Sequence, residues 1–430
     1  MYKEKVKELI MKKVDQYSII EQKRNESIIR FFNNSVSLAA TGSSTILQIY
    51  ATVGKKRSII TINNMVDLDR QVEIFVSKLQ SLPDGEVAEL PANANYKFNN
   101  DFDEQLDQEG MVRSVKDAIQ SAMEAGAERL AGIFKGNEYE IGIITSSGNE
   151  AVDKRTSYAL NIRAFKEGSS GSGISVSTRI SGIEPQAAGR EAGEISKLSH
   201  NPHKINEGIY DVLLYPNVSA SVLEMVGISA SAYLVEIGMS FLKGMLGKPV
   251  AASNFSLIDR GQVEGGIGSR AFDDEGAPTG ETEIIKDGVF NSYLHNSVTA
   301  KSWNTRTTGN AGIIEPEPWN LIVEGGRNTK DKLVSEIKRG IIITNNWYTR
   351  FNSYITGEFS TLARDAAFYV NNGQIEYPVS GFRLSDSLPR LLSNIVAFSQ
   401  TTKWIKWWGE VSTPVKAPYM LVQGINISVA

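Results

Sequence analysis

Cysteine is absent from the 430-residue sequence, and histidine occurs only three times. Without cysteine the chain has no disulfide framework, no thiolate ligand for zinc and no cysteine nucleophile. Two of the histidines, His200 and His203, lie in a polar segment in which Pro202 prevents a regular helix with both rings on one face. Because a zinc ion needs three or four ligands, we predict surface histidines here and no metal site.

The chain also lacks an excess of positive charge and a long apolar run. It has 45 basic and 49 acidic residues, and a net charge of −4 gives no electrostatic reason to expect binding to nucleic acid or an anionic membrane. The most apolar region, 211–247, is interrupted by charged residues, so no apolar span reaches the roughly 18 residues of a membrane helix. The first helix-like segment has no continuous apolar core of the kind that forms a secretory signal. These features predict a cytoplasmic protein.

The overall composition is that of a folded globular protein. Hydrophobic residues make up 41% of the chain and charged residues 22%. The length exceeds the roughly 250–300 residues at which a single hydrophobic core stops growing. We therefore expect at least two domains.

The first predicted domain, residues 1–200, contains a degenerate internal repeat with copies at 1–82 and 109–200. Each copy begins with a helix, continues with strand-like runs separated by glycine and serine, and closes with another helix. The opening helix of the second copy is predicted near 111–132. The polar segment 83–108 is typical of a linker. Each copy is thus predicted to be an antiparallel meander flanked by helices.

The second predicted domain, residues 201–430, is richer in strands. An Asp-Gly pair at 287–288 and an Asn-Gly pair at 372–373 each separate two apolar runs. Such pairs are the strongest short hairpin signals, because primed turns need positive φ. We predict antiparallel sheets crossed by a helix near 219–245, and a further helix near 386–400. The fold class predicted for the whole chain is α+β.

Three adjacent carboxylates, Asp273, Asp274 and Glu275, precede the first of these hairpins. Such a group can hold a hard cation or serve in acid–base chemistry, although successive residues of an extended chain point to opposite sides. On composition alone, a solvated turn is the favoured interpretation. His295 lies alone in a predicted strand, and a structural hydrogen-bonding role is favoured over catalysis.

Two further runs have some features of nucleotide-binding motifs. The glycine-rich run 264–270 lacks the Lys-Ser/Thr pair and the strand-loop-helix frame of a phosphate loop, so we predict a tight turn or a close approach of backbone. Trp404, Trp407 and Trp408 are interleaved with lysines, a combination that can stack nucleotides. The acidic net charge favours a packed or partner-facing patch instead.

Segments 272–300 and 357–388 resemble the modulator of DNA gyrase family, the TldD/PmbA proteins. In the first segment an acidic stretch leads into a hairpin, and in the second a later hairpin leads into a helix. The strand-like runs near the start of the chain are similar to the N-terminal strands of that family, so the resemblance covers nearly the whole sequence. It implies a function in the proteolysis or processing of unfolded peptides.

The resemblance also implies where zinc would bind. TldD-type members carry His-Glu-x-x-x-His on the helix that precedes the acidic segment, and a cysteine near the C-terminus. Aligned on Glu224, this sequence has Leu223 and Ile228 at the two histidine positions, and it has no thiol. Hydrocarbon side chains have no lone pair to donate, so we expect no metal and no catalytic residue in this chain. In lacking these zinc ligands the chain is similar to the TldE/PmbA branch, and the resemblance implies that Glu224 is the remnant of the family acid.

From the residues alone, Glu224 fits a hydrogen-bonded structural group as well as a residual role near a substrate channel. Residues spaced i,i+5 lie about 140° apart on a regular helix, so the zinc-bearing relatives need a local distortion such as a π-bulge. We expect Gly227 to preserve that distortion in this chain.

The resemblance implies a metal-free subunit that pairs with a zinc-bearing TldD-like subunit, with unfolded peptides entering a shared cavity. Glu224, Asp274, Glu275 and His295 are the candidate residues that would lie near this cavity. Two alternatives stay open. One is an autonomous hydrolase that uses Asp274 and Glu275, and the other is a peptide-binding module or homodimer without catalysis.

Overall fold

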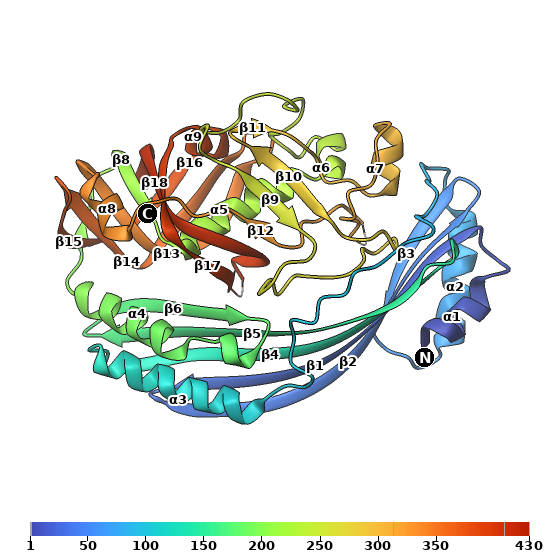
Figure 1. Ribbon diagram of the computed structural model, residues 1–430, viewed down its shortest axis with the longest axis horizontal. Coiled ribbons are helices and arrows are strands. Elements are labelled where there is room, and N and C mark those ends of the chain that lie inside the picture. The colour runs from blue at the N-terminus through green and yellow to red at the C-terminus, as the bar shows by residue number, and fades with distance from the viewer. Residues whose placement is uncertain (1, 313, 408, 430) are drawn as a thin grey trace.

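In the residues that the computed structural model describes (2–312, 314–407 and 409–429), the strands form two sheets. A curved six-stranded sheet lies along one side of the molecule, and a larger sheet of twelve strands faces it (Figure 1). Most strand pairs are antiparallel, and the few helices pack on the sheets, which confirms the predicted α+β class. The division into domains at residue 200 stays a prediction.

The helices are α1 (Tyr2–Ile10), α2 (Leu68–Ser81), α3 (Gln108–Glu124), α4 (Pro185–Leu198), α5 (Pro216–Ser229), α6 (Ala232–Glu236), α7 (Ser297–Ser302), α8 (Lys330–Ser335) and α9 (Leu388–Ser393), with a 3-10 turn at Ile180–Gly182. The strands of the first sheet are β1 (Gln16–Phe32), β2 (Ser35–Val53), β3 (Lys56–Ile62), β4 (Arg129–Thr145), β5 (Glu150–Lys166) and β6 (Ser169–Ser177). Those of the second sheet are β7 (His203–Lys204), β8 (Gly208–Leu214), β9 (Leu257–Arg260), β10 (Glu281–Lys286), β11 (Val289–Phe290), β12 (Leu321–Ile322), β13 (Arg339–Ser353), β14 (Glu358–Asn371), β15 (Gln374–Ser380), β16 (Phe382–Ser387), β17 (Ile395–Trp407) and β18 (Val411–Val429). Among the described helices, none is both long and apolar enough to cross a bilayer.

The first sheet has the order β3-β2-β1-β4-β5-β6, so each predicted copy of the repeat supplies three strands and the copies meet where β1 pairs with β4. Side chains alternate between the two faces of a strand. On β1, the odd-numbered Ile19 and Phe31 belong to the cores beneath α1–α2 and α3–α4, respectively. The even-numbered Ile20 packs on the opposite face, against Phe272 from the second half of the chain. The helices therefore cover one face, and the other face is directed at the second sheet (Figure 1).

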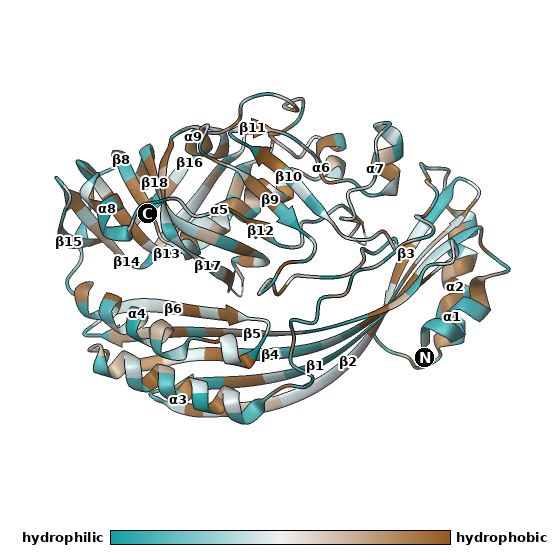
Figure 2. Ribbon diagram, in the orientation of Figure 1, coloured by the Kyte–Doolittle hydropathy of each residue, from teal (hydrophilic) through white to brown (hydrophobic). Residues whose placement is uncertain are grey.

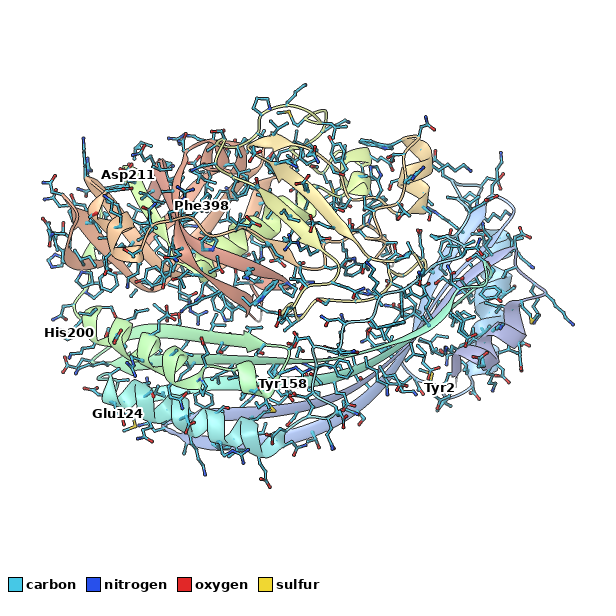
Figure 3. All side chains as sticks on the ribbon, viewed as in Figure 1. Tyr2, Glu124, Tyr158, His200, Asp211 and Phe398 are labelled. Carbon is cyan, nitrogen blue, oxygen red and sulfur yellow. The ribbon has the colours of Figure 1, made fainter. Side chains whose placement is uncertain are left out.

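The hydropathy pattern follows this division of faces. Figure 2 shows apolar and hydrophilic residues alternating along the strands of the first sheet and along α3 and α4. Tyr158, which lies in the core beneath α3 and α4, is fully buried, and burial of such an aromatic side chain contributes roughly 1.5–3 kcal/mol to stability. Figure 3 shows that side chains occupy much of the space between the ribbons of the two sheets.

The second sheet is built around β18, which pairs with β8, β12, β16 and β17. Helix α5 packs against this strand and against β13. Twelve of its fourteen residues are buried, which explains why its sequence has no polar face.

Both hairpins predicted from Asp-Gly and Asn-Gly pairs are confirmed. Asp287 and Gly288 have φ of 47° and 81°, and they connect β10 to β11. Asn372 and Gly373 have φ of 48° and 76°, and they connect β14 to β15.

Several predicted boundaries are wrong. The helix near 219–245 ends at Ser229, and the residues that follow form α6 and a series of turns with glycines at positive φ. The helix near 386–400 consists only of α9, because the residues after it pair with β18 as β17. The helix near 111–132 ends at Glu124, so that β4 can begin at Arg129 and pair with β5.

The strand runs of the first copy were also divided wrongly. Glycine and serine were expected to separate strand-like runs, but the residues on both sides of 42–44 form the single strand β2. Gly42, between them, pairs with Glu26 of β1 rather than forming a turn. The long partner strand β1 holds both runs in one ladder, which overrides the local turn preference of glycine and serine.

Candidate functional site

A cleft of about 330 Å³ lies between the two sheets. One wall consists of residues of β1, β4 and β5 on the face that is free of helices, and the other contains the end of β17 and the start of β18. Its charged lining residues are Arg24, Glu26, Lys135 and Lys406. On β1 the odd-numbered Ile29 and Phe31 lie in the core beneath α3 and α4, so alternation places the even-numbered Arg24 and Glu26 on the opposite face. On β4, Phe134 lies in that core, so its neighbour Lys135 also points to the cleft.

Glu224 lies behind this cleft, on α5, and is 6% exposed. Its Oε1 accepts hydrogen bonds from the amides of Ser412, which lines the cleft, and Thr413, at 2.8 and 2.6 Å. Burial raises the pKa of Glu224 to about 7, while the two amides and the charge of Lys406 oppose that rise. Glu224 is thus bonded to the backbone of β18, which fits the structural hydrogen-bonded group that is one of the two roles considered from the sequence.

The two residues that the resemblance aligns with histidines, Leu223 and Ile228, do not lie in one environment. Leu223 is fully buried in the core of the second sheet, whereas Ile228 is 37% exposed. Helix α5 is regular from Pro216 to Ser229, so the expected π-bulge is absent from this described segment. Gly227 has a packing function instead, because a Cβ atom there would lie 2.4 Å from Cδ1 of Leu321.

Asp274 and Glu275 line a different hollow, of about 180 Å³, which is bounded by β1, β2 and β3. Asp274 accepts from Arg270 Nη2 at 2.7 Å, and Glu275 Oε2 accepts from the amide of Ser297, the first residue of α7, at 2.8 Å. Burial raises the pKa of Glu275.

The third carboxylate of this run, Asp273, is fully buried and accepts from the amides of Glu275, Ala277 and Ala311 at 2.8–3.0 Å. Burial, followed by the charge of Glu275, raises the pKa of Asp273 to about 8. The prediction of a solvated turn for 273–275 is therefore wrong, because all three side chains are largely buried.

His295 lies in neither hollow. It is 6% exposed and belongs to the loop before α7, so its prediction as a strand residue is wrong. Its Nδ1 lies 3.1 Å from Thr299 Oγ1, and its ring packs against Tyr293 and Trp303. Burial lowers the pKa of His295 to about 4, so the ring is neutral at physiological pH and suits the structural role favoured from the sequence.

The structure gives no sign of a metal site in the described residues, where no group of three or more His, Asp or Glu side chains is arranged to hold an ion. His200 and His203 are exposed, as predicted. Of the four candidate cavity residues, only Asp274 and Glu275 come together. Lys135 and Lys406, which the sequence did not suggest, contribute two of the charges of the larger cleft.

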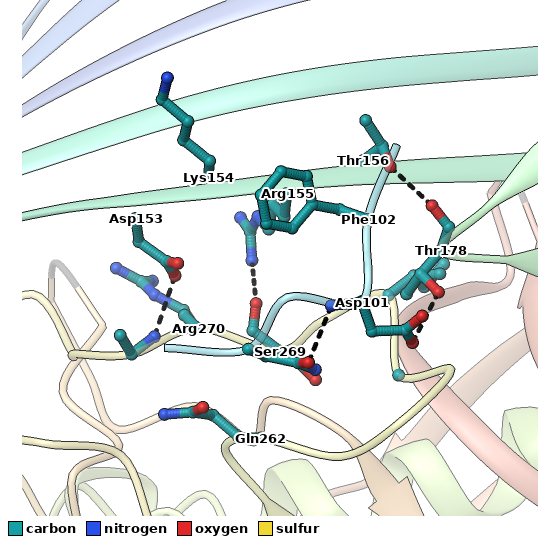
Figure 4. A pocket seen from close by; sticks show the side chains of 14 residues that line it. Asp101, Phe102, Asp153, Lys154, Arg155, Thr156, Thr178, Gln262, Ser269 and Arg270 are labelled. Atoms are coloured by element: carbon teal, nitrogen blue, oxygen red, sulfur yellow. Dashed lines mark hydrogen bonds between the residues drawn. The ribbon is translucent and has the colours of Figure 1, made fainter. Parts of the chain in front are cut away.

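The two motifs compared with nucleotide-binding runs have packing functions. Near 264–270, a hollow of about 20 Å³ has room for about one water molecule, and Figure 4 shows Arg155 donating to the carbonyl of Ser269 across it (3.1 Å). A Cβ atom at Gly268 would lie 2.1 Å from the carbonyl oxygen of Trp319, which confirms the close backbone approach. Trp404 and Trp407 are half-buried, as predicted for a packed patch, and Trp408 lies outside the described residues.

The fold is shared with several solved structures. A modulator of DNA gyrase from Thermotoga maritima superposes with a TM-score of 0.86 at 24% identity, with 99% of each chain covered. TldE from Thermococcus kodakarensis gives a TM-score of 0.85 at 16% identity, also with 99% of each chain covered. At these identities the likeness concerns the fold.

Sequence comparison defines the family. The PmbA/TldA metallopeptidase C-terminal domain matches residues 207–429, and the central domain of the same family matches residues 100–199. These matches cover well over half of the chain, which therefore belongs to the PmbA/TldD metallopeptidase family.

Curated relatives agree. A metalloprotease PmbA homolog from Haemophilus influenzae is 28% identical over 197 residues (46% of this chain, 42% of the relative), and metalloprotease PmbA from Escherichia coli O157:H7 is 32% identical over 157 residues (36% and 33%). A metalloprotease from Methanothermobacter thermautotrophicus is 27% identical over 301 residues (65% and 64%). The matched region of this chain thus spans from a third to just under two thirds of the length of these relatives.

Proposed function

We propose that this chain is the metal-free, TldE/PmbA-like subunit of a cytoplasmic TldD/TldE-type peptidase that degrades or processes unfolded peptides. The proposal depends on the environments of three residues of α5. Leu223 is sealed in the core, Ile228 has no donor atom, and Glu224 is bonded to the amides of β18. Without a metal to lower the pKa of a bound water, the acid has no nucleophile to activate. The zinc is assigned to a TldD-like partner subunit.

An exposed strand edge supports association with such a partner. β3 pairs with β2 only from Leu47 onward, so residues 35–46 of β2 have no strand on their outer side in the described chain. These residues include no charged side chain, and most are exposed. A long uncharged edge invites pairing with another chain unless a partner covers it. We assign this edge to the TldD-like subunit.

A second strand edge supports peptide binding. β17 pairs with β18, and its other edge makes only a bridge between Asn328 and Ser399 among the described residues. Residues 401–407 therefore offer backbone donors and acceptors next to the cleft. An extended peptide that adds to such an edge is held mainly by its backbone, which suits substrates of varied sequence.

The test is copurification of this chain with a TldD-like homologue, followed by elemental analysis and peptide digestion. We expect zinc and cleavage in the complex, and neither in this chain alone. Replacing Ala40 at the exposed edge of β2 by lysine should weaken the complex, whereas the same change at Ala187, an exposed position of α4, should not. Stoichiometric zinc with proteolysis in the isolated chain, or a lone chain that never associates, would overturn the proposal.

The hydrolase alternative depends on the hollow that contains Asp274 and Glu275. Both side chains are held by internal hydrogen bonds, which disfavours acid–base chemistry. If the isolated chain hydrolyses peptides, and alanine at both positions abolishes that activity, the alternative replaces the scaffold role.

A further inference from the structure

We propose that Lys135 and Lys406 form a carboxylate-binding site in the cleft between the two sheets, and that the site holds a carboxylate group of the bound peptide. This inference rests on the peptide-binding function proposed above and specifies a chemical group that the chain recognises. Lys135 belongs to β4 of the first sheet and Lys406 to β17 of the second, so the two ammonium groups enter the same cleft from different walls.

The charges of the cleft do not balance. Arg24 forms an ion pair with Glu26 and donates to Asn137 at 2.9 Å. Glu26, the only acidic side chain among the described residues that line the cleft, is therefore already engaged. The side-chain ammonium groups of Lys135 and Lys406 form no hydrogen bond or ion pair within the described part of the chain. Two positive charges are thus left without a direct partner.

The nearest acid does not supply that partner. Glu224 favours the charged form of Lys406 through space, but in the described residues no ion pair joins the two side chains, and Oε1 of Glu224 accepts from the amides of Ser412 and Thr413. Arg24 repels both lysines, and Arg155 adds to the repulsion at Lys406. Burial and this repulsion lower the pKa of Lys406 to about 8 and also lower the pKa of Lys135. A bound anion would relieve both effects, because a buried charge without a partner is costly.

The remaining lining residues suit the end of a peptide. Asn161 enters the cleft from β5, and its Oδ1 is buried without a hydrogen-bond partner in the described residues. Tyr139 and Trp407 supply apolar surface. A volume of about 330 Å³ is at the lower end of the range for ligand sites, which restricts the occupant to a few residues. The free edge of β17 ends at this position and would guide an extended chain into it.

A carboxylate is the peptide group that these lysines recognise best, since it accepts charge-assisted hydrogen bonds from both ammonium groups. It can come from the C-terminus of the peptide or from an aspartate or glutamate side chain. Three short probes separate these sources: acetyl-trialanine as the free acid, the same peptide as the amide, and acetyl-Ala-Asp-Ala-amide. Their affinities for the full chain are measured by isothermal titration calorimetry at low ionic strength.

We expect the free acid to bind about tenfold or more tightly than the amide. K406M and K135M should each remove that difference, whereas K406R should retain it. K116M changes an exposed lysine on α3 and should leave binding unaltered. If the aspartate probe binds like the amide, the site reads the C-terminus, and if it binds like the acid, the site accepts either source. Circular dichroism of each variant verifies that the fold is intact.

Equal binding of acid and amide, unchanged binding by the two methionine variants, or no binding of the acid to the folded chain would each overturn the site. A longer unfolded peptide without acidic residues and with an amidated C-terminus tests the proposed function separately. If it is cleaved by the complex while the acid effect is absent, the function stands and the carboxylate site falls. If the acid binds in a lysine-dependent manner but no zinc-bearing partner associates, the site stands and the subunit role falls.

Discussion

Glu224 of α5 and Thr413 of β18 are 189 residues apart in the sequence, and the amide of Thr413 donates to Oε1 of Glu224 at 2.6 Å. A zinc peptidase needs such an acid to face a metal-bound water. In this chain the carboxylate of Glu224 links α5 to β18 by hydrogen bonds. It therefore stabilises the packing of the helix on the sheet. A carboxylate at this position therefore has a structural role that requires no metal ligand.

Replacement of Glu224 by glutamine should stabilise the protein at alkaline pH. The pKa of Glu224 is raised from 4.5 to about 7, so the folded chain retains a proton that the unfolded chain releases, and wild-type stability falls as pH rises from about 4.5 to 7. Glutamine keeps an oxygen for the two amides and carries no charge. We expect Glu224→Gln to be more stable than wild type by up to about 3 kcal/mol at pH 8, and nearly equal to it at pH 4.5.

Urea unfolding at the two pH values measures this difference. Glu73→Gln, at an exposed position of α2, is the matched control and should show no such pH-dependent gain. A Glu224→Gln variant that is equally or less stable than wild type at pH 8 would contradict the proposed cost of the buried charge.

Alanine at Gly227 tests whether this residue is kept for packing. In a helix interior, Gly→Ala normally gains about 1 kcal/mol. Here the new Cβ atom would lie 2.4 Å from Cδ1 of Leu321, so we expect Gly227→Ala to destabilise by about 1–3 kcal/mol. Gly42→Ala, in β2, is the control because a Cβ atom there meets nothing within 4 Å. A lower urea midpoint for Gly227→Ala alone supports the close contact, and a higher one refutes it.

The sequence predicted well those features that depend on neighbouring residues. The turns at Asp287 and Asn372 were identified because an Asp-Gly or Asn-Gly pair tolerates positive φ, and this requirement is met within a few residues. The surface positions of His200 and His203 were likewise predicted from the polar residues and the proline beside them.

Features that depend on distant contacts could not be predicted in the same way. The sequence predicts a helix near 386–400, and only pairing with β18 makes the last residues of that segment the start of β17. Burial of Asp273 depends on amides from Ala277 and Ala311, and the second of these is far along the chain. The alternation of β4 places Lys135 opposite its buried neighbour Phe134, but nothing in the sequence indicates that Lys406 enters the same cleft.

Protonation of His295 should destabilise the fold in acid. Burial lowers the pKa of His295 from 6.5 to about 4, so between these values the unfolded chain binds a proton that the folded chain does not. Above about pH 6.5 this residue does not reduce the free energy of unfolding. As the pH falls toward 4, the free energy of unfolding decreases by about 2–3 kcal/mol. The imidazole Cε1–H signal, assigned with His295→Gln, should titrate in the folded protein with a midpoint near 4. A midpoint at or above 6 would contradict the buried, neutral state.

The ion pair between Arg163 of β5 and Asp365 of β14 joins the two sheets. Asp365 has a fully buried side chain and also accepts from Ser170 Oγ at 2.9 Å and from Asn345 Nδ2 at 2.6 Å. Arg163→Met would leave that carboxylate buried without its cation, so we expect a loss of about 3–5 kcal/mol. Asp365 has φ of 63°, a conformation that asparagine also tolerates. The double variant Arg163→Met, Asp365→Asn should therefore recover part of the loss, because it removes the unpaired charge without straining the backbone. A double-mutant cycle by chemical unfolding measures this coupling, and strictly additive effects would show that the pair does not link the sheets energetically.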